Sequence, residues 1–581
     1  MILTKLLARI FSRVARIPAT NGSDLDSDLQ QGYRLQQAGD HVAAELSFRQ
    51  VLNLDAHNAE AHYLLGALLG ESGSLGEAAV HLDQALAANP DLAVAHAARG
   101  NVFLLQDERQ AAHASYQQAL RCDPANAAAH FNLGLLLRNA GAREEALDHF
   151  ERAYATAPDI PDLLKNLTLL RLEFEHYDTA KSSLQRVLAL TPQNLEALKC
   201  MGLVLQKMHC PEMALEYYTT ARSIDAADAE LLNNLGIVMQ DLGRLDEAIA
   251  SYDAAIALKP DFSLAIWHRS LARLLRHDFA GGWPDYELRL ASEDQPRRPR
   301  EFPRWDGAAL AGKRLLAYAE QGLGDEIMFA SCLPDVIAAS GHCVIECSPK
   351  LETLFRRSFA AATVYAARPD KSLPAGVLSS GIDVQCPIGS LPLTCRRERA
   401  AFPRHKGYLH ADPELVGAWR ARLVALGPGL KVGIAWQGGT HKSRRPVRSV
   451  PLARWLPILR SANVQFIDLQ YTDSAAELDA LHAATGVRVH SWEEVRRDYE
   501  QTAALVAALD LVVSVCTAVI HLGGALGRQV WVMAPFSPEW RYGIAGEEMP
   551  WYPSVRVFRQ PRYGDWDAVI DHAAQSLRQI T

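Results

Sequence analysis

The 581-residue sequence lacks several features that define whole classes of protein. It contains no apolar run of the roughly 18 residues that a membrane-spanning helix needs. Its nine cysteines are an odd number, and no two of them are separated by two residues. These absences argue against a disulfide scaffold and predict a cytoplasmic protein. A composition of 49% hydrophobic and 22% charged residues excludes a mostly disordered or collagen-like chain.

A strong positive charge is also missing. The formal net charge is -8, which argues against a general nucleic-acid binder and leads us to expect no nucleic-acid partner. The charge is uneven, because residues 1–290 carry 25 Lys and Arg against 37 Asp and Glu, whereas residues 291–581 carry 34 against 30. The two halves of the chain are therefore expected to have different roles.

Residues 1–24 read as a basic amphipathic leader. Four cations precede the first acid, Asp24, and apolar residues fall on one helical face. Charges interrupt the apolar run and no A-x-A site follows, so a secretory signal is not expected. The segment either caps the following domain or frays, or residues 1–20 rest on an anionic membrane surface.

A 34-residue period follows, from about residue 25 to 262. A small residue, an alanine and a residue that is aromatic or leucine each recur with this period, as in Gly100, Ala112 and Tyr116. A position that is usually proline ends each unit, because proline cannot donate a helical hydrogen bond. The pattern predicts a solenoid of helix hairpins over residues 25–291, with about seven repeats and a degenerate eighth that closes the end. It resembles the tetratricopeptide repeat.

Such solenoids have a concave face that binds partners. Four asparagines fall near first-helix positions that are expected to face it: Asn101, Asn132, Asn166 and Asn234. Their amides could pair with the backbone of an extended protein or peptide segment, or they could simply be solvated. The simplest function of this half is partner binding.

The segment 292–309 is rich in proline and arginine and breaks the period, so we expect a linker there. Beyond it, strand and helix patterns alternate, which predicts parallel sheets covered by helices. We expect two Rossmann-like lobes, at 310–410 and 411–581. In such a fold ligands bind beyond the carboxyl ends of the strands, in the cleft between the lobes.

The first motif with a chemical reading is EQGLGDE, residues 320–326, between a predicted strand and a helix. Gly322 and Gly324 allow the backbone to come close to a ligand and to take a positive φ. Asp325 is either the N-cap of the helix or a carboxylate in the cleft that acts as a general base.

The second motif is WQGGTHKSRRPVRSVPL, residues 436–452, which begins at a predicted strand end and runs through Gln437. The stretch from Lys431 to Arg448 contains five basic residues and no acid. This polar, glycine-containing loop suits a diphosphate, with Lys442 and Arg448 as the favoured cations. The alternative is a solvated basic loop.

The third and fourth motifs lie in the predicted second lobe. A helix is expected to start near Thr517 and Ala518, with Thr517 and His521 on one face and its N-terminus directed at a phosphate. Gly523 and the glycine after it permit close packing of this helix on the sheet. The loop APFSPEWRYG, residues 534–543, brings Arg541 toward the cleft. No metal site is expected.

Together, GLGDE, the basic loop that ends in RSVPL, and SVCTAVIHLGGALGRQVW followed by APFSPEWRY resemble the GT-B glycosyltransferases related to lipopolysaccharide heptosyltransferases, glycosyltransferase family 9. The resemblance covers about residues 310–580, and the arrangement of repeats before such a domain resembles that of O-GlcNAc transferase. It implies inverting sugar transfer from a nucleotide-sugar donor with no essential metal. Asp325 would be the base.

The resemblance also implies where the donor diphosphate lies. It would contact Arg448, with Lys442 as an alternative, and the helix start at Thr517, Ala518 and His521. Cys516 stands where the family usually has an aspartate.

Two hypotheses for the function follow. The first is a metal-independent inverting glycosyltransferase whose repeats recruit the acceptor, which could be a protein. The second is a repeat scaffold whose C-terminal region is non-catalytic or binds only a nucleotide. The departure at Cys516 motivates the second.

Overall fold

The computed structural model describes residues 24–158, 161–291, 302–370, 372–439 and 445–581. By its internal contacts the chain forms two compact units, Met1–Asp225 and Ala226–Thr581. Each unit is described separately. The leader predicted at 1–24 lies outside the described residues except for its last position, and so does most of the linker predicted at 292–309.

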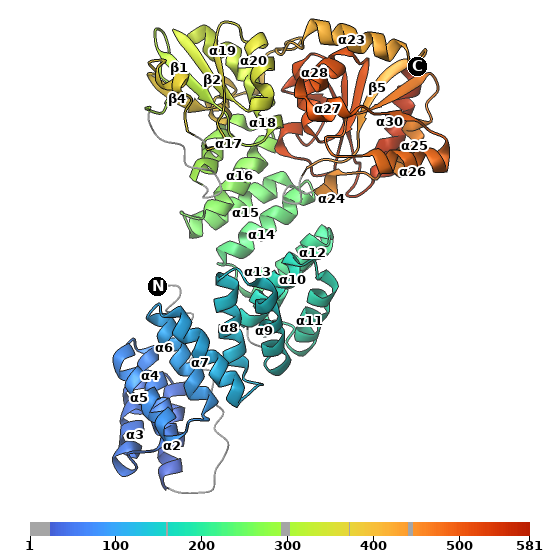
Figure 1. Cartoon of the computed structure of the whole chain (residues 1–581). Coiled ribbons are helices and arrows are strands. Elements are labelled where there is room, and N and C mark those ends of the chain that lie inside the picture. The colour runs from blue at the N-terminus through green and yellow to red at the C-terminus, as the bar shows by residue number, and fades with distance from the viewer. Residues whose placement is uncertain (1–23, 159–160, 292–301, 371, 440–444) are drawn as a thin grey trace. The chain divides into compact units, whose positions relative to one another are not determined.

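The first unit consists of antiparallel helix hairpins, coloured blue to teal in Figure 1. Its helices are α2 (Asp24–Gln37), α3 (His41–Leu54), α4 (Ala59–Glu71), α5 (Leu75–Ala88), α6 (Ala93–Leu105), α7 (Arg109–Cys122), α8 (Ala127–Asn139), α9 (Arg143–Thr156), α10 (Pro161–Glu173), α11 (Tyr177–Leu190), α12 (Leu195–Lys207) and α13 (Pro211–Ile224). The predicted repeat array is confirmed here, because one hairpin occupies each 34-residue period.

The small residue of each repeat makes room for the large one sixteen positions later in the same hairpin. A Cβ added to Gly100 would lie 2.5 Å from Tyr116 Cε1, and one added to Gly134 would lie 2.6 Å from Phe150 Cε1. Each ring is fully buried. The glycine therefore sets how closely the two helices of a hairpin approach.

The turn inside each hairpin repeats a left-handed residue every 34 positions. Four repeats use glycine there and four do not: Gly39, Gly73, Asp107, Gly141, Glu175, His209, Gly243 and His277 all have φ between 59° and 87°. The period therefore extends to backbone conformation, and four side chains are held where glycine is favoured.

The second unit begins with two further hairpins. They comprise α14 (Ala229–Asp241), α15 (Leu245–Leu258), α16 (Ser263–Leu275) and α17 (Phe279–Tyr286), and the 3₁₀ turn η1 (Glu287–Ala291) follows α17. The helix α17 is short because Pro284 lies inside it.

The first sheet is entirely parallel, with strand order β3-β2-β1-β4. Its strands are β1 (Arg314–Tyr318), β2 (His342–Cys347), β3 (Thr363–Ala366) and β4 (Val384–Pro387). Its helical segments are α18 (Leu323–Phe329), η2 (Ala330–Cys332), α19 (Leu333–Ala339), η3 (Pro349–Leu351), α20 (Glu352–Ser358), α21 (Ala375–Leu378), η4 (Ile388–Ser390), α22 (Pro392–Cys395) and η5 (Arg399–Ala401). The single helix expected after residue 326 is broken at η2, before Pro334.

The second sheet has the order β10-β11-β9-β8-β5-β6-β7 and is parallel except for the antiparallel pair β10–β11. Its strands are β5 (Leu430–Ala435), β6 (Val464–Asp468), β7 (Val489–His490), β8 (Leu511–Val515), β9 (Val530–Ala534), β10 (Glu548–Met549) and β11 (Tyr552–Arg559). Its helical segments are α23 (Pro413–Val424), α24 (Arg445–Arg448), η7 (Leu452–Trp455), α25 (Leu456–Leu459), α26 (Ala475–Thr485), α27 (Glu493–Arg497), α28 (Tyr499–Ala508), α29 (Ala518–Ala525), η8 (Trp540–Tyr542) and α30 (Trp566–Ile580). The expected alternation of strands and helices is present.

One hydrophobic core joins the last hairpin to both sheets. Trp283 of α17 packs against Phe329 of α18 and Trp540 of η8, with ring centroids 6.5 and 5.4 Å apart, and its indole N–H donates to the carbonyl of Arg396 at 2.8 Å. Figure 1 shows α17 directly beside α18. The end of the repeats is therefore part of the folded α/β unit.

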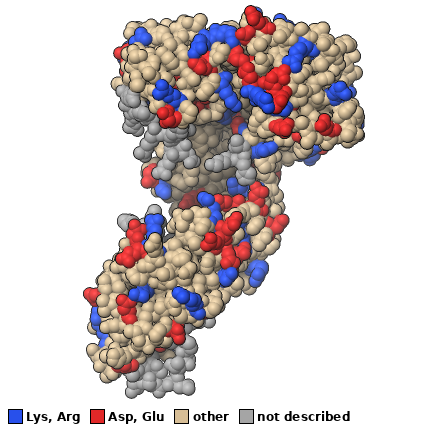
Figure 2. All heavy atoms as spheres, in the orientation of Figure 1, with Lys and Arg blue, Asp and Glu red and all other residues tan. Residues whose placement is uncertain are grey.

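Among the described residues, no helix is long and apolar enough to span a membrane. All nine cysteines are free thiols. On the face of the α/β region shown in Figure 2, acidic and basic side chains lie close to one another in mixed patches.

Candidate functional site

The predicted GLGDE loop connects β1 to α18 and carries Asp325 into the first turn of that helix. Gly322 is the N-cap, and its N–H donates to Asp325 Oδ2 at 3.4 Å. The alternative that Asp325 is itself the N-cap is therefore wrong: it occupies the third helical position and its side chain reaches back to the cap.

The two glycines of this loop differ in role. Gly322 has φ -97° and a Cβ there would meet only Asp325 Oδ2, at 3.5 Å. A Cβ on Gly324 would lie 3.2 Å from His521 Cδ2 and 3.3 Å from Ala518 Cα. Gly324 therefore brings the first turn of α18 against the first turn of α29. Neither glycine has a positive φ, so the left-handed conformation that glycine allows is not used at these two positions.

Asp325 is paired with a cation from the loop that follows β9 in the second sheet. Arg541 of η8 donates from Nε to Asp325 Oδ1 at 2.9 Å, and its Nη2 reaches the same oxygen. The guanidinium lies over the Trp540 ring, 4.8 Å from the centroid. Burial works against the charge of Arg541, but Asp325 and Glu539 outweigh it, so its pKa is raised above the usual range.

Glu539 extends this pair into a chain of four charges. One of its oxygens lies 3.5 Å from Arg541 Nη1 and the other pairs with Arg448 Nη1. The Arg448 and Arg541 side chains are mostly buried, at 12% and 14% exposed, whereas that of Glu539 is 34% exposed. Two cations thus share one carboxylate, which is the most exposed of the three.

His521 is held neutral in this cluster. It is buried, and burial together with Arg541 and Arg448 lowers its pKa to about 3. Its Nδ1 lies 3.2 Å from the hydroxyl of Tyr552. An uncharged imidazole at the start of α29 supplies hydrogen bonding rather than positive charge.

The start of α29 meets the loop that follows β5. Thr517 is its N-cap residue, and a Cβ on Gly438 would lie 3.0 Å from Thr517 Cγ2 and 2.6 Å from the carbonyl oxygen of Cys516. Gly439 has φ +82° and approaches the Arg448 guanidinium. Gly523 in turn lies against Val530 of β9, where an added Cβ would be 2.6 Å from Val530 Cγ2, which confirms the predicted close helix–sheet packing.

Most of the residues predicted from sequence lie together. Contacts link Asp325, Gly322 and Arg541, and Arg448 joins them through Glu539. Gly324 joins Ala518 and His521 to the same region.

Gln437 lies in a separate polar group. Its amide donates to Glu477 Oε2 at 3.2 Å and its Oε1 accepts from Arg445 at 2.6 Å. Lys442 lies outside the described residues.

Cys516 does not leave an open position at the strand end. Its side chain is 2% exposed, its thiol donates to the Met533 carbonyl at 3.9 Å, and burial raises its pKa to about 12. The thiol is therefore protonated and packed against β9.

Three residues contribute to the site but were not proposed from the sequence. Gln321, just before the GLGDE segment, has φ +65°. Tyr552 contacts His521, as given above. Arg559 at the end of β11 donates to the carbonyls of Tyr542 and Gly543, at 2.5 and 2.8 Å, and so fixes the loop after η8. Gln321 belongs to the EQGLGDE motif, but nothing in the motif indicates its positive φ, and no local pattern in the sequence marks Tyr552 or Arg559.

The asparagines of the repeats divide into two kinds. Asn101 and Asn132 are 3% and 1% exposed, and Asn132 Nδ2 donates to Asn101 Oδ1 at 2.7 Å. Tyr116 donates to the same oxygen at 2.7 Å. These two are structural, whereas Asn166 and Asn234 are half-buried.

Within the described ranges, no group of three or more His, Cys, Asp or Glu side chains could hold a metal ion. The chemistry of the cluster is that of paired carboxylates and guanidinium groups beside two helix N-termini. Such a site can bind an anion and move a proton.

The repeats define the class of the N-terminal region. Models of the tetratricopeptide repeat match residues 35–102, 97–161 and 229–262, so this region is a tetratricopeptide-repeat array of the kind that binds proteins or peptides. The α/β region beyond it is compatible with an enzyme domain.

One curated protein is similar to part of this chain. Protein FlbA of Caulobacter vibrioides is 34% identical over 356 residues, which cover 58% of this chain. The chain spans 59% of the length of FlbA.

Two solved structures are also similar to part of the chain. YrrB, described as a tetratricopeptide-repeat protein with an unusual peptide-binding site, is 25% identical over 33% of this chain and 98% of its own, with a TM-score of 0.29. PilF of Pseudomonas aeruginosa is 25% identical over 36% and 94%, with a TM-score of 0.32.

Proposed function

We propose that the chain is a metal-independent inverting glycosyltransferase of the GT-B type. It would move a sugar from a nucleotide-sugar donor to an acceptor that the repeats recruit. The acceptor could be a protein. The observation that carries the proposal is the charge chain Asp325–Arg541–Glu539–Arg448 beside the first turns of α18 and α29. The resemblance of residues 310–580 to glycosyltransferase family 9 supports the same reading.

In this mechanism Asp325 takes the proton of the acceptor hydroxyl. The acceptor oxygen attacks the anomeric carbon, and the bond from that carbon to the diphosphate oxygen breaks with its electron pair leaving on the diphosphate. Arg448 and Arg541 would stabilise the developing negative charge, together with the free N–H groups at the start of α29. The configuration at the anomeric carbon inverts.

The experiment has two parts. Calorimetry with UDP-, ADP- and GDP-sugars identifies the donor class, and Asp325→Asn is then tested against it. We expect turnover to fall by roughly 10²- to 10⁴-fold while donor affinity stays close to that of the wild type. Asp370→Asn, a change in an exposed loop beside the same sheet, is the matched control. Full activity in Asp325→Asn would remove the base assignment.

A second function is favoured by Cys516, a buried thiol where the resembled family usually has an acid. In it, the chain is a repeat scaffold whose α/β region binds a nucleotide or nothing. Absence of both heat and hydrolysis with every donor would support the scaffold and overturn the enzyme.

A further inference from the structure

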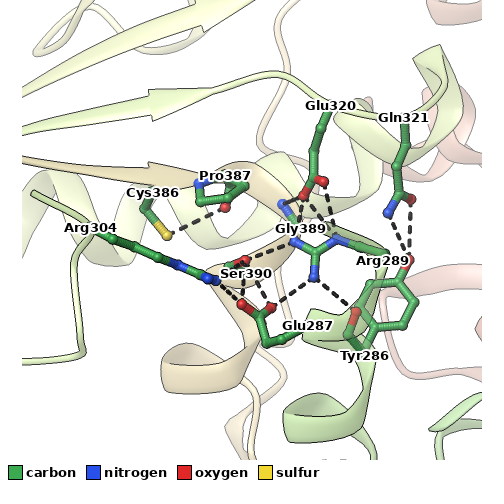
Figure 3. A network of polar contacts seen from close by, with 10 residues as sticks. All are labelled: Tyr286, Glu287, Arg289, Arg304, Glu320, Gln321, Cys386, Pro387, Gly389 and Ser390. Atoms are coloured by element: carbon green, nitrogen blue, oxygen red, sulfur yellow. Dashed lines mark hydrogen bonds and ion pairs between the residues drawn. The ribbon is translucent and has the colours of Figure 1, made fainter. Parts of the chain in front are cut away.

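A buried polar network connects the end of the repeats to the loop that carries Asp325 (Figure 3). Arg289 of η1 is 5% exposed. Its Nη2 donates to Glu320 Oε1 at 2.5 Å, and its Nε lies 3.1 Å from both carboxylate oxygens. Glu320 lies two residues beyond the end of β1 and is the first residue of the EQGLGDE segment, so the guanidinium holds the start of this loop in place.

The network closes through the loop that follows β4. The N–H of Gly389 donates to Glu320 Oε1 at 3.0 Å, and Arg289 donates to Ser390 Oγ at 2.7 Å. Glu287 accepts from Arg289 Nη1 and from Ser390 Oγ, at 2.7 and 2.8 Å. Three segments distant in sequence therefore share one set of charge-assisted hydrogen bonds, and a bidentate guanidinium fixes direction as well as distance.

The next residue of the loop is held in an unfavourable conformation. Gln321 has φ +65°, a region that side chains other than glycine avoid. Its amide lies 3.1 Å from the Tyr286 hydroxyl through both its oxygen and its nitrogen. Such a conformation persists only where neighbouring contacts enforce it. Tyr286, at the end of α17, supplies one of those contacts next to the N-cap of α18.

The same helix packs beneath both partners of the Asp325–Arg541 pair. The Tyr286 ring lies 5.7 Å from Trp540, the residue before Arg541, and 6.5 Å from Phe329, the last residue of α18. The ring of Tyr286 also lies under the Arg289 guanidinium, at 4.8 Å. The end of α17 therefore fixes the positions of α18 and η8, as well as the path of the loop between β1 and α18.

We propose that Arg289 and Tyr286 are positioning residues for the reaction at Asp325. The last repeat is then part of the catalytic unit and not solely an arm that recruits the acceptor. This inference rests on the proposed function. It predicts that loss of the Arg289–Glu320 contact displaces the loop that carries Asp325, while the Tyr286 ring still supports η8 and the residues that hold the donor.

The test uses the full chain and a matched control. Arg289→Met removes the grip on Glu320, whereas Arg304→Met removes a cation that reaches Glu287 and Ser390 in the same network. Tyr286→Phe removes one hydroxyl and keeps the packing, so it serves if Arg289→Met fails to fold. The readouts are kcat with the nucleotide sugar found by calorimetry, and the Kd for the matching nucleoside diphosphate.

We expect Arg289→Met to lower kcat by roughly 10²-fold, as a misplaced base does, with Kd within about twofold of the wild type. Tyr286→Phe should lower kcat by a smaller factor in the same manner, and Arg304→Met should change neither value. Unchanged kcat in both Arg289→Met and Tyr286→Phe would overturn the inference. So would an equal loss in Arg304→Met, or a Kd that weakens in step with kcat.

Hydrogen exchange of residues 320–329 without any ligand separates this inference from the proposed function. Faster exchange there in Tyr286→Phe, with unchanged exchange in Arg304→Met, supports the inference that Tyr286 and Arg289 hold this loop in place, even if no sugar is transferred. Unchanged exchange in Tyr286→Phe overturns it. Failure of the wild type to bind or turn over any donor would refute only the proposed function.

Discussion

Arg541 donates to Asp325 from Nε at 2.9 Å, so the carboxylate proposed as the base is paired with a cation of the protein itself. The same guanidinium touches Glu539, which also pairs with Arg448. An incoming anion must therefore compete with a carboxylate that belongs to the protein. The following predictions begin from that competition.

Glu539→Gln should strengthen the binding of inorganic pyrophosphate. The change removes the negative charge that Arg448 and Arg541 share, and because Glu539 is one-third exposed the gain should be modest, roughly 3- to 10-fold in Kd. Isothermal calorimetry measures it. Glu547→Gln, which loses an exposed pair with Arg556, is the control. Weaker binding in Glu539→Gln would mean that the carboxylate positions the two cations instead.

Gly324→Ala should damage the site where Gly322→Ala does not. A methyl group on Gly324 would meet α29 at 3.2 and 3.3 Å, whereas one on Gly322 would make an ordinary contact at 3.5 Å. We expect Gly324→Ala to lower the melting temperature, at a cost of about 1 kcal/mol or more, and to reduce turnover. Equal melting temperatures and rates for the two variants would contradict the close approach of α18 and α29.

Two histidine pairs should make the repeats sensitive to acid. His62 and His81 face each other through Nδ1 at 3.0 Å, and His130 and His149 do so at 2.8 Å, two repeats later. Burial lowers the pKa of His81, and likewise the pKa of His130 and His149, from 6.5. The unfolded chain therefore binds more protons just below pH 6.5, so stability present above that pH is lost as the pH falls.

A double variant checks this pH dependence. His81→Gln with His149→Gln should show a smaller decrease in melting temperature than the wild type as the pH falls below 6.5, because two of the perturbed groups are gone. Arg49 and Glu77 flank His81, and Arg152 and Asp148 flank His149, so salt should be held constant. His57→Gln, at an exposed site, should leave the decrease unchanged. Parallel curves for all three proteins would refute the role of the pairs.

Two glycines three residues apart should respond to alanine in opposite directions. Gly73 has φ +87° with open space around it, so Gly73→Ala should cost about 1 kcal/mol of stability through backbone strain alone. Gly76 lies within α5, also in open space, and Gly76→Ala should add up to about 1 kcal/mol. Denaturant unfolding of the full chain measures both. Changes of the same sign would contradict the left-handed turn.

The repeats could be predicted from the sequence because each register repeats in every unit. The packing of Gly100 on Tyr116 occurs again as Gly134 on Phe150, so a pattern of residue types identifies the contact without coordinates. The strands could also be recognised, since a buried parallel strand such as β9 is apolar throughout. These features are local or periodic, and sequence patterns describe such features well.

The polar site was only half predictable. Asp325 and His521 each lie in a helix that follows a strand recognisable in the sequence, and both belong to the cluster. Glu539 reaches Arg448 across 91 positions and Arg289 reaches Glu320 across 31. Such pairs form where loops of different elements converge, and nothing in either local sequence names the partner. The positive φ of Gln321 is likewise enforced from outside its own segment.

The aromatic cluster under the site has an optical consequence. Trp283 of the last repeat lies 5.4 Å from Trp540 and 6.3 Å from Trp551, ring centroid to centroid. Indoles held rigidly at such spacing dominate the near-ultraviolet circular dichroism of a protein, a signal that vanishes when tertiary packing loosens. The near-ultraviolet spectrum of the wild type therefore reports whether the last repeat remains packed on the α/β region.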